Sequence, residues 1–380
     1  MSQLDYFNDT HQQLRQSVRK FVEKEIRPYV AEWEEAGTFP RELYLKAGAA
    51  GFLGIGFPEE YGGLGEDVFT AVAFTEEIVR STSGGLVASL GSLGIGLPPV
   101  AKWGSPEMKA KVIPEVLRGE KISALAITEP SGGSDVANLK TRAVKDGDHY
   151  IVNGSKTFIT SGVRADYYTV AVRTGGDGYG GVSLLLIEKG TPGFTVGRNL
   201  KKMGWWASDT AELFFQDVRV PVKNLIGPEN GGFFCIMTNF QAERLNLAII
   251  ATTTAQIALE ECLRYVKERE AFGKPLSKFQ VIKHKLADMA TQIEVSREMN
   301  YRVAAKMAAG QSVIREVSMA KNFATDVSDF CTYEATQIFG GMGFMRESVV
   351  ERLYRDNRIL SIGGGTREIM NEVIAKQLGL

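Results

Sequence analysis

The spacing of apolar residues changes twice along this chain, and this change limits what the chain can fold into. Before Ile122 apolar side chains recur mostly at the spacing of amphipathic helices. After Ile122 the chain breaks into short β-branched or aromatic runs bounded by Gly, Pro, Asn and Asp, without βαβ spacing. Long helical stretches return after Gly232. The pattern predicts an α+β protein with a helical N-terminal domain in residues 1–121, a central antiparallel β domain in 122–230 and a C-terminal four-helix bundle in 231–380.

Four segments in the last third are long enough to be the helices of a bundle. Each carries apolar residues at positions i, i+3, i+4 and i+7, so one face of each would be buried. Short links between them favour antiparallel neighbours. The segments are 233–268, 280–309, 315–339 and 351–379. The chain also opens with such a pattern, from Asp9 to Glu35.

Composition and motifs exclude several classes of function. The formal net charge of −1 gives no overall field that would attract nucleic acid or an acidic membrane face. The three cysteines form no CxxC pair and the three histidines no HExxH, so we expect no metal site. No GxGxxG follows a strand, and neither a P-loop nor a GxSxG elbow occurs. An enzyme without these motifs is expected to depend on a bound organic cofactor.

The first residues do not resemble a targeting segment. They lack an apolar core behind a basic start, and Asp5 and Asp9 argue against a transit peptide. No uninterrupted apolar run approaches the roughly 20 residues that a membrane span needs. We therefore expect a cytoplasmic protein without a membrane or nucleic-acid partner.

The run ALAITEPSGGSDVANLKT contains a candidate ligand turn. A strand through Leu125 and Ile127 would end in a polar turn where Thr128, Gly133 and Ser134 offer hydroxyl and backbone N–H groups. Paired glycines let backbone approach a ligand closely. Taken alone, the run fits a capped turn before a helix better than a ligand turn.

The run NGSKTFITSG follows. There Phe158, Ile159 and Thr160 could place an aromatic ring and a hydroxyl beside the same ligand. Taken alone, this run would be an edge strand.

Two further motifs lie in the C-terminal third. In ERxAFG…FQ, Arg269 at a helix end, Phe272, and Gln280 at the next helix start could grip a pyrophosphate and ribose. Arg269 could instead satisfy the carbonyls that end its helix. The fourth motif runs from Gln337 to Ile369, and we expect Arg355 and Asp356 within it to form an ion pair. Its glycine run before Thr366 would open the last helix and offer N–H groups to an anion or a carbonyl oxygen.

These four motifs, in this order and over essentially the whole chain, resemble the acyl-CoA dehydrogenase family. The resemblance implies bound FAD, the acyl-CoA substrate, and a homotetramer (a dimer of dimers) in which a neighbouring subunit completes each FAD site. One subunit would hold the flavin ring through Leu125, Ile127, Thr128, Gly133, Ser134, Phe158, Ile159 and Thr160. The other would contact the adenosine diphosphate half through Arg269, Phe272, Gln280, Gln337, Gly340 and Gly341, and Thr366 and Glu368 would close over the cofactor.

One departure from the common family pattern concerns the catalytic base. Most members carry a glutamate immediately before the final GT, where this chain has Gly364. The isovaleryl-CoA and long-chain branches carry it on the first bundle helix, before an arginine, and QAERLNLA places Glu243 before Arg244. The resemblance therefore implies that Glu243 is the base. Taken alone, Glu243 would be a solvated helix glutamate. The residues expected to contact substrate are Ser134, Gln241, Arg244, Gly364 and Gly365.

The chemistry that this implies is α,β-dehydrogenation of the thioester to a trans-2-enoyl-CoA, with electrons passed to electron-transfer flavoprotein. Glu243 would remove the α-proton, burial would raise its pKa, and the Gly364 N–H would help to stabilise charge on the thioester oxygen. The resemblance implies that the missing side chain at Gly364 frees space near the acyl α- and β-carbons, which would admit branched acyl groups. By analogy, the small residues 91–96 would lie near the floor of a deep pocket. We therefore expect medium to long acyl chains, straight or methyl-branched. A flavin monooxygenase or oxidase on the same fold is an alternative function. A non-catalytic assembly scaffold is a further alternative.

Overall fold

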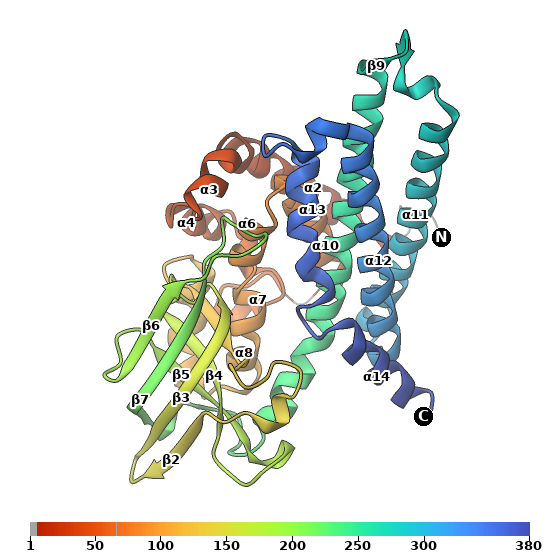
Figure 1. Ribbon diagram of the computed structural model, residues 1–380. Helices are drawn as coiled ribbons and strands as arrows, with labels where there is room; N and C mark the ends of the chain where they lie inside the picture. The colour runs from red at the N-terminus through yellow and green to blue at the C-terminus, as the bar shows by residue number, and fades with distance from the viewer. Residues whose placement is uncertain (1–5, 66) are drawn as a thin grey trace.

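The protein consists of the three predicted parts in the predicted order, as Figure 1 shows for the computed structural model, so the predicted fold class is confirmed. The structure describes residues 6–65 and 67–380. Asp5, used above in the argument on targeting, lies outside these ranges. The helices of the first part are α2 (Asp9–Phe21), α3 (Val30–Ala36), α4 (Glu42–Ala49), α5 (Val68–Ile78), α6 (Gly84–Leu90), α7 (Leu93–Gly96), α8 (Pro98–Trp103) and α9 (Pro106–Leu117).

The first predicted helix is interrupted. After α2 the chain takes a π-helical turn (Val22–Ile26) and a 3-10 turn (Arg27–Tyr29) before α3 begins. Pro28 accounts for the break, because proline lacks an N–H and its ring clashes with the carbonyl four residues before it. The start of α2 is fixed by a capping box, in which Asn8 accepts from the His11 N–H and the His11 ring accepts from the Asn8 N–H.

The central sheet has the order β6-β7-β3-β2-β4-β5-β8, with β1 also paired to β4. Its strands are β1 (Ser123–Ala126), β2 (Arg142–Asp146), β3 (His149–Thr160), β4 (Tyr167–Arg173), β5 (Val182–Glu188), β6 (Phe194–Asn199), β7 (Thr210–Pro221) and β8 (Leu225–Ile226). Most strand pairs are antiparallel, as predicted, but β1 and β2 run parallel to β4. The long connection between β1 and β2 lets the chain re-enter the sheet in the same direction, which a hairpin cannot do. Nor is β3 an edge strand, since it lies between β7 and β2.

The last part contains α10 (Gly232–Glu268), α11 (Gln280–Ala308), α12 (Ile314–Phe339), α13 (Val349–Asn357) and α14 (Arg367–Gln377). In Figure 1, α10, α11, α12 and α13 lie side by side as the bundle. The fourth predicted segment is not continuous, because a 3-10 turn (Arg358–Ser361) and a glycine turn separate α13 from α14. Gly364 and Gly365 take φ angles of +65° and +95°, which favour glycine and end the helical path.

A buried charged cluster joins the three parts and confirms the expected ion pair of Arg355 and Asp356, 3.4 Å apart. The Asp356 carboxylate accepts from the backbone N–H groups of Gly84 in the first part (2.9 Å) and Trp205 after β6 (2.6 Å). The Arg355 guanidinium also donates to Glu34 at 2.9 Å. These contacts fix the sheet and the N-terminal helices against the bundle.

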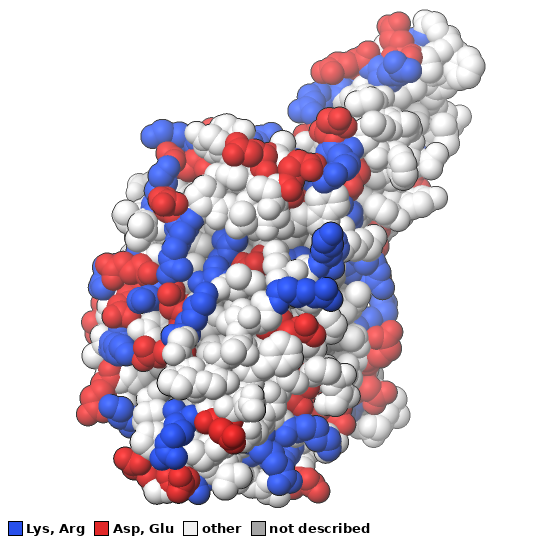
Figure 2. Space-filling model, turned by 60° about the vertical axis from the view of Figure 1, so that its left-hand side comes forward, with Lys and Arg blue, Asp and Glu red and all other residues white. Residues whose placement is uncertain are grey.

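The surface carries both signs of charge. On the face shown in Figure 2, the Lys and Arg side chains lie interspersed with Asp and Glu. Within residues 6–65 and 67–380, no individual helix combines the length and apolarity of a membrane span. Gly84–Leu90 and Leu93–Trp103 meet those two criteria only as a pair, which is bent by 43°.

Candidate active site

Glu243 stands one third of the way along α10 with its carboxylate in the interior. Its Oε2 atom is buried and has no hydrogen-bond partner among the described residues. Burial raises the pKa of Glu243 to about 7, although the positive charges of Arg244 and Lys321 oppose that rise. A buried carboxylate without a partner lowers stability, so its presence indicates a functional position.

The Glu243 carboxylate faces the glycine turn that precedes α14. A Cβ built on Gly364 would lie 3.5 Å from Glu243 Oε1. The same Cβ would lie only 2.4 Å from Leu247 Cδ1, one helical turn after Glu243 on α10. The expected space at Gly364 is therefore not empty in this structure, because the end of the Leu247 side chain reaches into it.

The carbonyl groups of this turn face cations of the bundle. Lys321 Nζ on α12 donates to the Gly365 carbonyl at 2.8 Å, and Arg244 Nε approaches the Gly364 carbonyl at 3.5 Å. Arg244 is buried beside Glu243, which fits its predicted place at the site. Gln241 is half-buried one position before Ala242 on the same helix.

Backbone pairing brings the first two motifs together. The Thr157 N–H, one residue before Phe158, donates to the Thr128 carbonyl at 2.9 Å. Gly133 and Ser134 are exposed beyond this junction, where a Cβ built on the neighbouring Gly132 would meet nothing within 4 Å. No α-helix follows the turn, only a 3-10 turn at Val136–Asn138, so the capped-helix alternative is wrong.

Side chains in these motifs divide between surface and core. Phe158 is 68% exposed and has a φ of +58°, a strained conformation for a bulky residue. Thr128, Thr160 and Leu125 are half-buried. Ile127 and Ile159 are buried in the core, so only their backbone groups can reach a ligand. An exposed aromatic ring beside an open, glycine-lined turn fits the face of a flavin ring.

A buried ion pair that the sequence analysis missed holds this turn. Lys156 Nζ lies 2.8 Å from Glu129 Oε1, and both side chains are almost fully buried. The same carboxylate accepts from the backbone N–H groups of Lys140 and Thr141. Burial alone would raise the pKa of Glu129, but Lys156 and these donors lower it to about 2. The sequence did contain a signal for this pair, because Glu129 stands before Pro130 in the first motif and Lys156 stands inside the strand pattern of the second.

The residues expected to hold the adenosine diphosphate half lie at the other end of the bundle. Phe272 is 95% exposed between the short strands β9 (Glu270–Ala271) and β10 (Lys274–Pro275), at the top of Figure 1. Arg269 directly follows α10 and is exposed, and the exposed Gln280 begins α11. Gln337, Gly340 and Gly341 are exposed at the end of α12.

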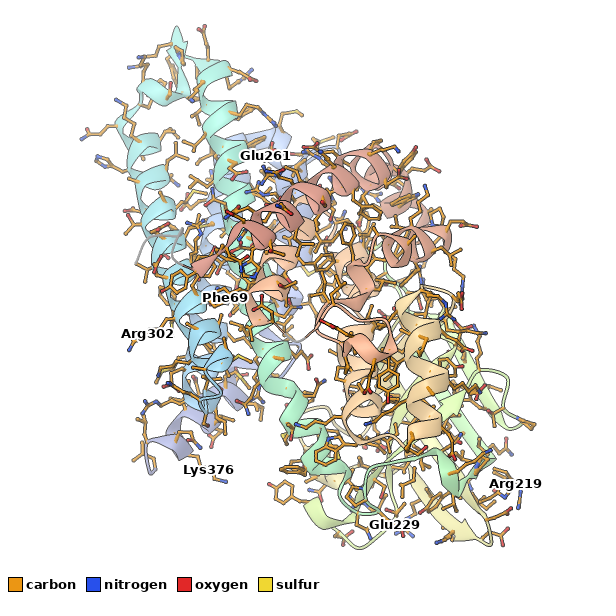
Figure 3. The ribbon with its side chains drawn as sticks, turned by 180° about the vertical axis from the view of Figure 1, so that it is seen from behind. Phe69, Arg219, Glu229, Glu261, Arg302 and Lys376 are labelled. Atoms are coloured by element: carbon orange, nitrogen blue, oxygen red, sulfur yellow. The ribbon has the colours of Figure 1, made fainter. Side chains whose placement is uncertain are left out.

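One copy of the chain does not bring these residues to the turn at Gly133. Arg269 lies 26 positions after Glu243, a separation of roughly 40 Å at 1.5 Å per helical residue. Figure 3 shows α10 from behind, with Glu229 just before it beside the sheet and Glu261 toward its other end. The two sets of residues therefore present two separate exposed faces of the chain.

Thr366 and Glu368 lie at the start of α14, after the glycine turn. The Thr366 hydroxyl accepts from the Ile369 N–H at 3.3 Å and so caps the helix. Glu368 is exposed, and its pKa is lowered by its own backbone N–H and by the Thr366 hydroxyl. Among the described ranges, no group of three or more His, Cys, Asp or Glu side chains is arranged to hold a metal ion.

A cavity of about 570 Å³ lies on the neighbouring face of α10. Ala242, Leu245 and Ile249 line it from α10, opposite Val68 and Ala71 of α5 and Pro98 of α8. Residues 91–96 include α7, where a Cβ built on Gly94 would meet nothing within 4 Å. The volume falls within the range of roughly 300–1,000 Å³ that is usual for small-molecule sites.

Three family models together match nearly the entire chain. They describe the acyl-CoA dehydrogenase N-terminal domain (residues 8–120), middle domain (124–218) and C-terminal domain (230–379). The long-chain specific acyl-CoA dehydrogenase of Sus scrofa is 42% identical over 98% of this chain and 87% of its own length. The short-chain specific acyl-CoA dehydrogenase of Clostridium acetobutylicum is 40% identical over 98% and 99%. A probable acyl-CoA dehydrogenase from Mycobacterium abscessus superposes with a TM-score of 0.97 at 55% identity, covering 98% of this chain and all of the other.

Proposed function

This chain belongs to the acyl-CoA dehydrogenase family, and from that premise we propose that Glu243 is the base that removes the α-proton of an acyl-CoA thioester. The protein is thus an FAD-dependent oxidoreductase. The observation that supports Glu243 is its buried, unpaired carboxylate, 3.5 Å from the place of a Gly364 Cβ. That carboxylate borders the volume that a side chain at position 364 would enter, which is where the resemblance implies that most members carry their base.

The reaction requires a base that is deprotonated and a donor for the thioester oxygen. With a pKa of about 7, Glu243 is close to the value at which a general base operates best at neutral pH. The backbone N–H of Gly364 is the donor that we assign to the enolate-like oxygen, and Gly365, Arg244, Gln241 and Ser134 are assigned to substrate binding. FAD held by the residues of the Phe158 face would supply the acceptor for the β-hydrogen.

We assign FAD binding to the two exposed faces described above. The first face contributes backbone groups of Leu125, Ile127 and Gly133, side chains of Thr128, Ser134 and Thr160, and the Phe158–Ile159 segment. The second face contributes Arg269, Phe272, Gln280, Gln337, Gly340 and Gly341. Because the two faces lie far apart in one chain, a homotetramer built as a dimer of dimers would bring the second face of one subunit to the first face of another. Thr366 and Glu368 would flank the cofactor.

We further propose medium to long acyl chains, straight or methyl-branched, as substrates. Identity alone does not choose the length, since the long-chain and short-chain relatives are almost equally similar. The cavity beside Ala242 supports longer chains, because its volume and its apolar residues suit a distal alkyl chain. Branching is not supported by empty space at Gly364, because Leu247 fills that position.

Electron-transfer flavoprotein is the proposed electron acceptor and the cytoplasm the proposed location. The first proposal rests on the family, and the second repeats the expectation stated for the sequence. A flavin oxidase or monooxygenase is the second candidate function. The buried carboxylate of Glu243 favours dehydrogenation, because removal of an α-proton is the step that needs it. A scaffold without activity would have no use for such a carboxylate.

The visible spectrum of the purified protein tests this proposal. It would be recorded before and after anaerobic addition of straight and branched acyl-CoAs. A flavin band that bleaches on addition supports acyl-CoA oxidation, and separating the thioesters then identifies the substrate. A flavin band that stays unchanged with every thioester, together with fast oxygen consumption on another substrate, would overturn dehydrogenation in favour of the oxidase.

A further inference from the structure

Lys321 of α12 is a fully buried lysine beside the glycine turn. Its side chain is 0% exposed, and the hydrogen bond recorded for its ammonium goes to the Gly365 carbonyl at 2.8 Å. A Cβ on Gly364 would lie 3.7 Å from Lys321 Cε and 3.5 Å from Glu243 Oε1. The ammonium stem and the carboxylate therefore border the same small volume. Burying an apolar side chain at this helix position would cost less free energy than burying a charged one. The buried ammonium therefore indicates a functional role.

The glycine turn needs an external restraint. Three consecutive glycines, Gly363 to Gly365, have more conformational freedom than any other tripeptide, and two of them take left-handed φ angles here. On its C-terminal side, the Thr366 cap fixes the start of α14. Two side chains approach the carbonyl groups of the turn. Arg244 Nε lies 3.5 Å from the Gly364 oxygen, and Lys321 Nζ lies 2.8 Å from the Gly365 oxygen. The Lys321 contact is thus the stronger of these two restraints on the turn.

The charges around Glu243 come from three helices. Arg244 follows it on α10 and Lys321 faces it from α12, and both lower its pKa against the effect of burial. On α14, Arg367 is paired with Asp326 and acts on Lys321, while Glu368 is exposed. Burial in turn lowers the pKa of Lys321 to about 8, so the lysine is still mostly charged at pH 7. Lys321 therefore favours the ionised form of Glu243 at neutral pH.

We propose that Lys321 is a positioning residue for the dehydrogenation, one that pins the Gly364–Gly365 peptide opposite Glu243 and keeps a positive charge beside the base. The inference rests on the proposed role of Glu243. It assigns no contact with substrate to Lys321. It predicts two separable effects of removing the ammonium: a looser turn and a base that is harder to ionise.

Two substitutions test it, Lys321→Met, which keeps volume without charge, and Lys321→Arg, which keeps the charge. For Lys321→Met we expect kcat/KM at pH 7 to fall about 10- to 100-fold, as for other small misplacements of reacting groups. The acid limb of the pH profile should move upward by about half a pH unit or more, because the charge that favours ionised Glu243 is gone. Lys321→Arg should restore the position of the acid limb. A Lys321→Met enzyme with an unchanged acid limb would overturn the electrostatic role.

Hydrogen exchange of the cofactor-free protein tests the pinning without any turnover. Peptides covering residues 363–366 should exchange faster in Lys321→Met than in wild type, while peptides from the sheet should not change. Unchanged exchange of the turn would overturn the pinning. If wild type oxidises no acyl-CoA, the proposed function fails, whereas this measurement still decides what Lys321 does to the turn. If Lys321→Met does not fold, Lys321→Gln provides the neutral variant.

Lys202→Met is the matched control. Lys202 is also largely buried, its pKa is lowered by burial to about 8, and its ammonium donates to the Ser208 carbonyl and to Thr210 Oγ1. Its charged neighbours are those of the domain junction, such as Asp209 and Asp356, and do not include Glu243. The control should lower the melting temperature without moving the acid limb. A shift of the acid limb in Lys202→Met as large as in Lys321→Met would contradict a specific role for Lys321.

Discussion

Glu243 Oε1 lies 3.5 Å from the point where a side chain on Gly364 would begin. The two residues are 121 positions apart in the sequence and come from a helix and a turn on opposite sides of one small volume. A carboxylate from either side would reach the same place. This convergence is the physical reason for proposing Glu243 as the base in a chain that has glycine at position 364.

Glu243→Gln should remove most of the activity while leaving the site intact. Glutamine has nearly the same shape but cannot accept the α-proton, so we expect kcat to fall about 10²- to 10⁴-fold, the usual contribution of a general base. FAD content and acyl-CoA binding should stay near wild type, as measured by absorbance and titration. Glu261→Gln, farther along α10 and paired with Arg264, is the control and should keep full activity. Near-wild-type turnover in Glu243→Gln would refute the assignment.

Moving the base back to the turn should succeed only if Leu247 is shortened. In Glu243→Gln/Gly364→Glu, the new Cβ would meet Leu247 Cδ1 at 2.4 Å, and Gly364 also has a φ of +65°. We expect little recovery in this double variant. Adding Leu247→Ala should restore about 10-fold or more of the lost kcat, because the clash is relieved. Equal rates with and without Leu247→Ala would show that Leu247 does not control this space.

The pH dependence should follow the raised pKa of Glu243. As a base it must be ionised, so kcat/KM of wild type should fall as pH drops below about 7. A pH–rate profile with free enzyme and substrate measures this limb. A limb near the ordinary glutamate value of 4.5 would contradict the buried, unpaired environment.

The raised pKa of Glu243 also predicts how the free energy of unfolding depends on pH. Most paired carboxylates stabilise the fold more as the pH rises, whereas Glu243 should stabilise it less. Between pH 4.5 and about 7, Glu243 keeps its proton in the folded state but loses it in the unfolded chain. The stability that comes from protonated Glu243 is therefore fully present below pH 4.5, and it is lost as the pH rises through about 7. In the cofactor-free protein, Glu243→Gln should therefore be more stable than wild type above pH 7, by about 1–3 kcal/mol. Urea melts at pH 5 and pH 8 measure the difference. A gap that does not widen at the higher pH would contradict the raised pKa.

Lys156 and Glu129 should depend on each other. Lys156→Met leaves the Glu129 carboxylate buried without its partner, which costs about 3–5 kcal/mol for a buried pair. The double variant Lys156→Met/Glu129→Gln should be more stable than Lys156→Met alone, because no unpaired charge remains. Thermal melts and FAD content measure the effect on the fold and on the turn at Gly133. Additive losses in the double variant would show that the two side chains act independently.

Ala242→Phe should shorten the range of accepted acyl chains. Ala242 lines the cavity of about 570 Å³ beside the base, and a phenyl ring would occupy part of it. We expect kcat/KM for long-chain thioesters to fall at least 10-fold, while short-chain thioesters, which serve as the internal control, change little. A uniform loss over all chain lengths would show that the distal chain does not enter this cavity.

The sequence by itself determined the order of helical, sheet and bundle parts, the boundaries of most long helices and the motifs around Thr128, Phe158, Arg269 and Gln337. These follow from local properties, namely hydrophobic period, turn residues and short motifs, which neighbouring residues express without distant contacts. The sequence also showed that Glu243 is present on the first bundle helix and that position 364 has glycine instead of glutamate, because both positions lie inside short motifs.

Only the tertiary structure decided which distant side chains share a volume. It placed Leu247 where Gly364 was expected to leave space, buried Lys321 and Lys156 against backbone carbonyls, and ran β1 and β2 parallel to β4. Packing sets these relationships, since each depends on how separate elements cross and on which polar groups must find partners once buried. The spacing of residues along a chain carries no such information.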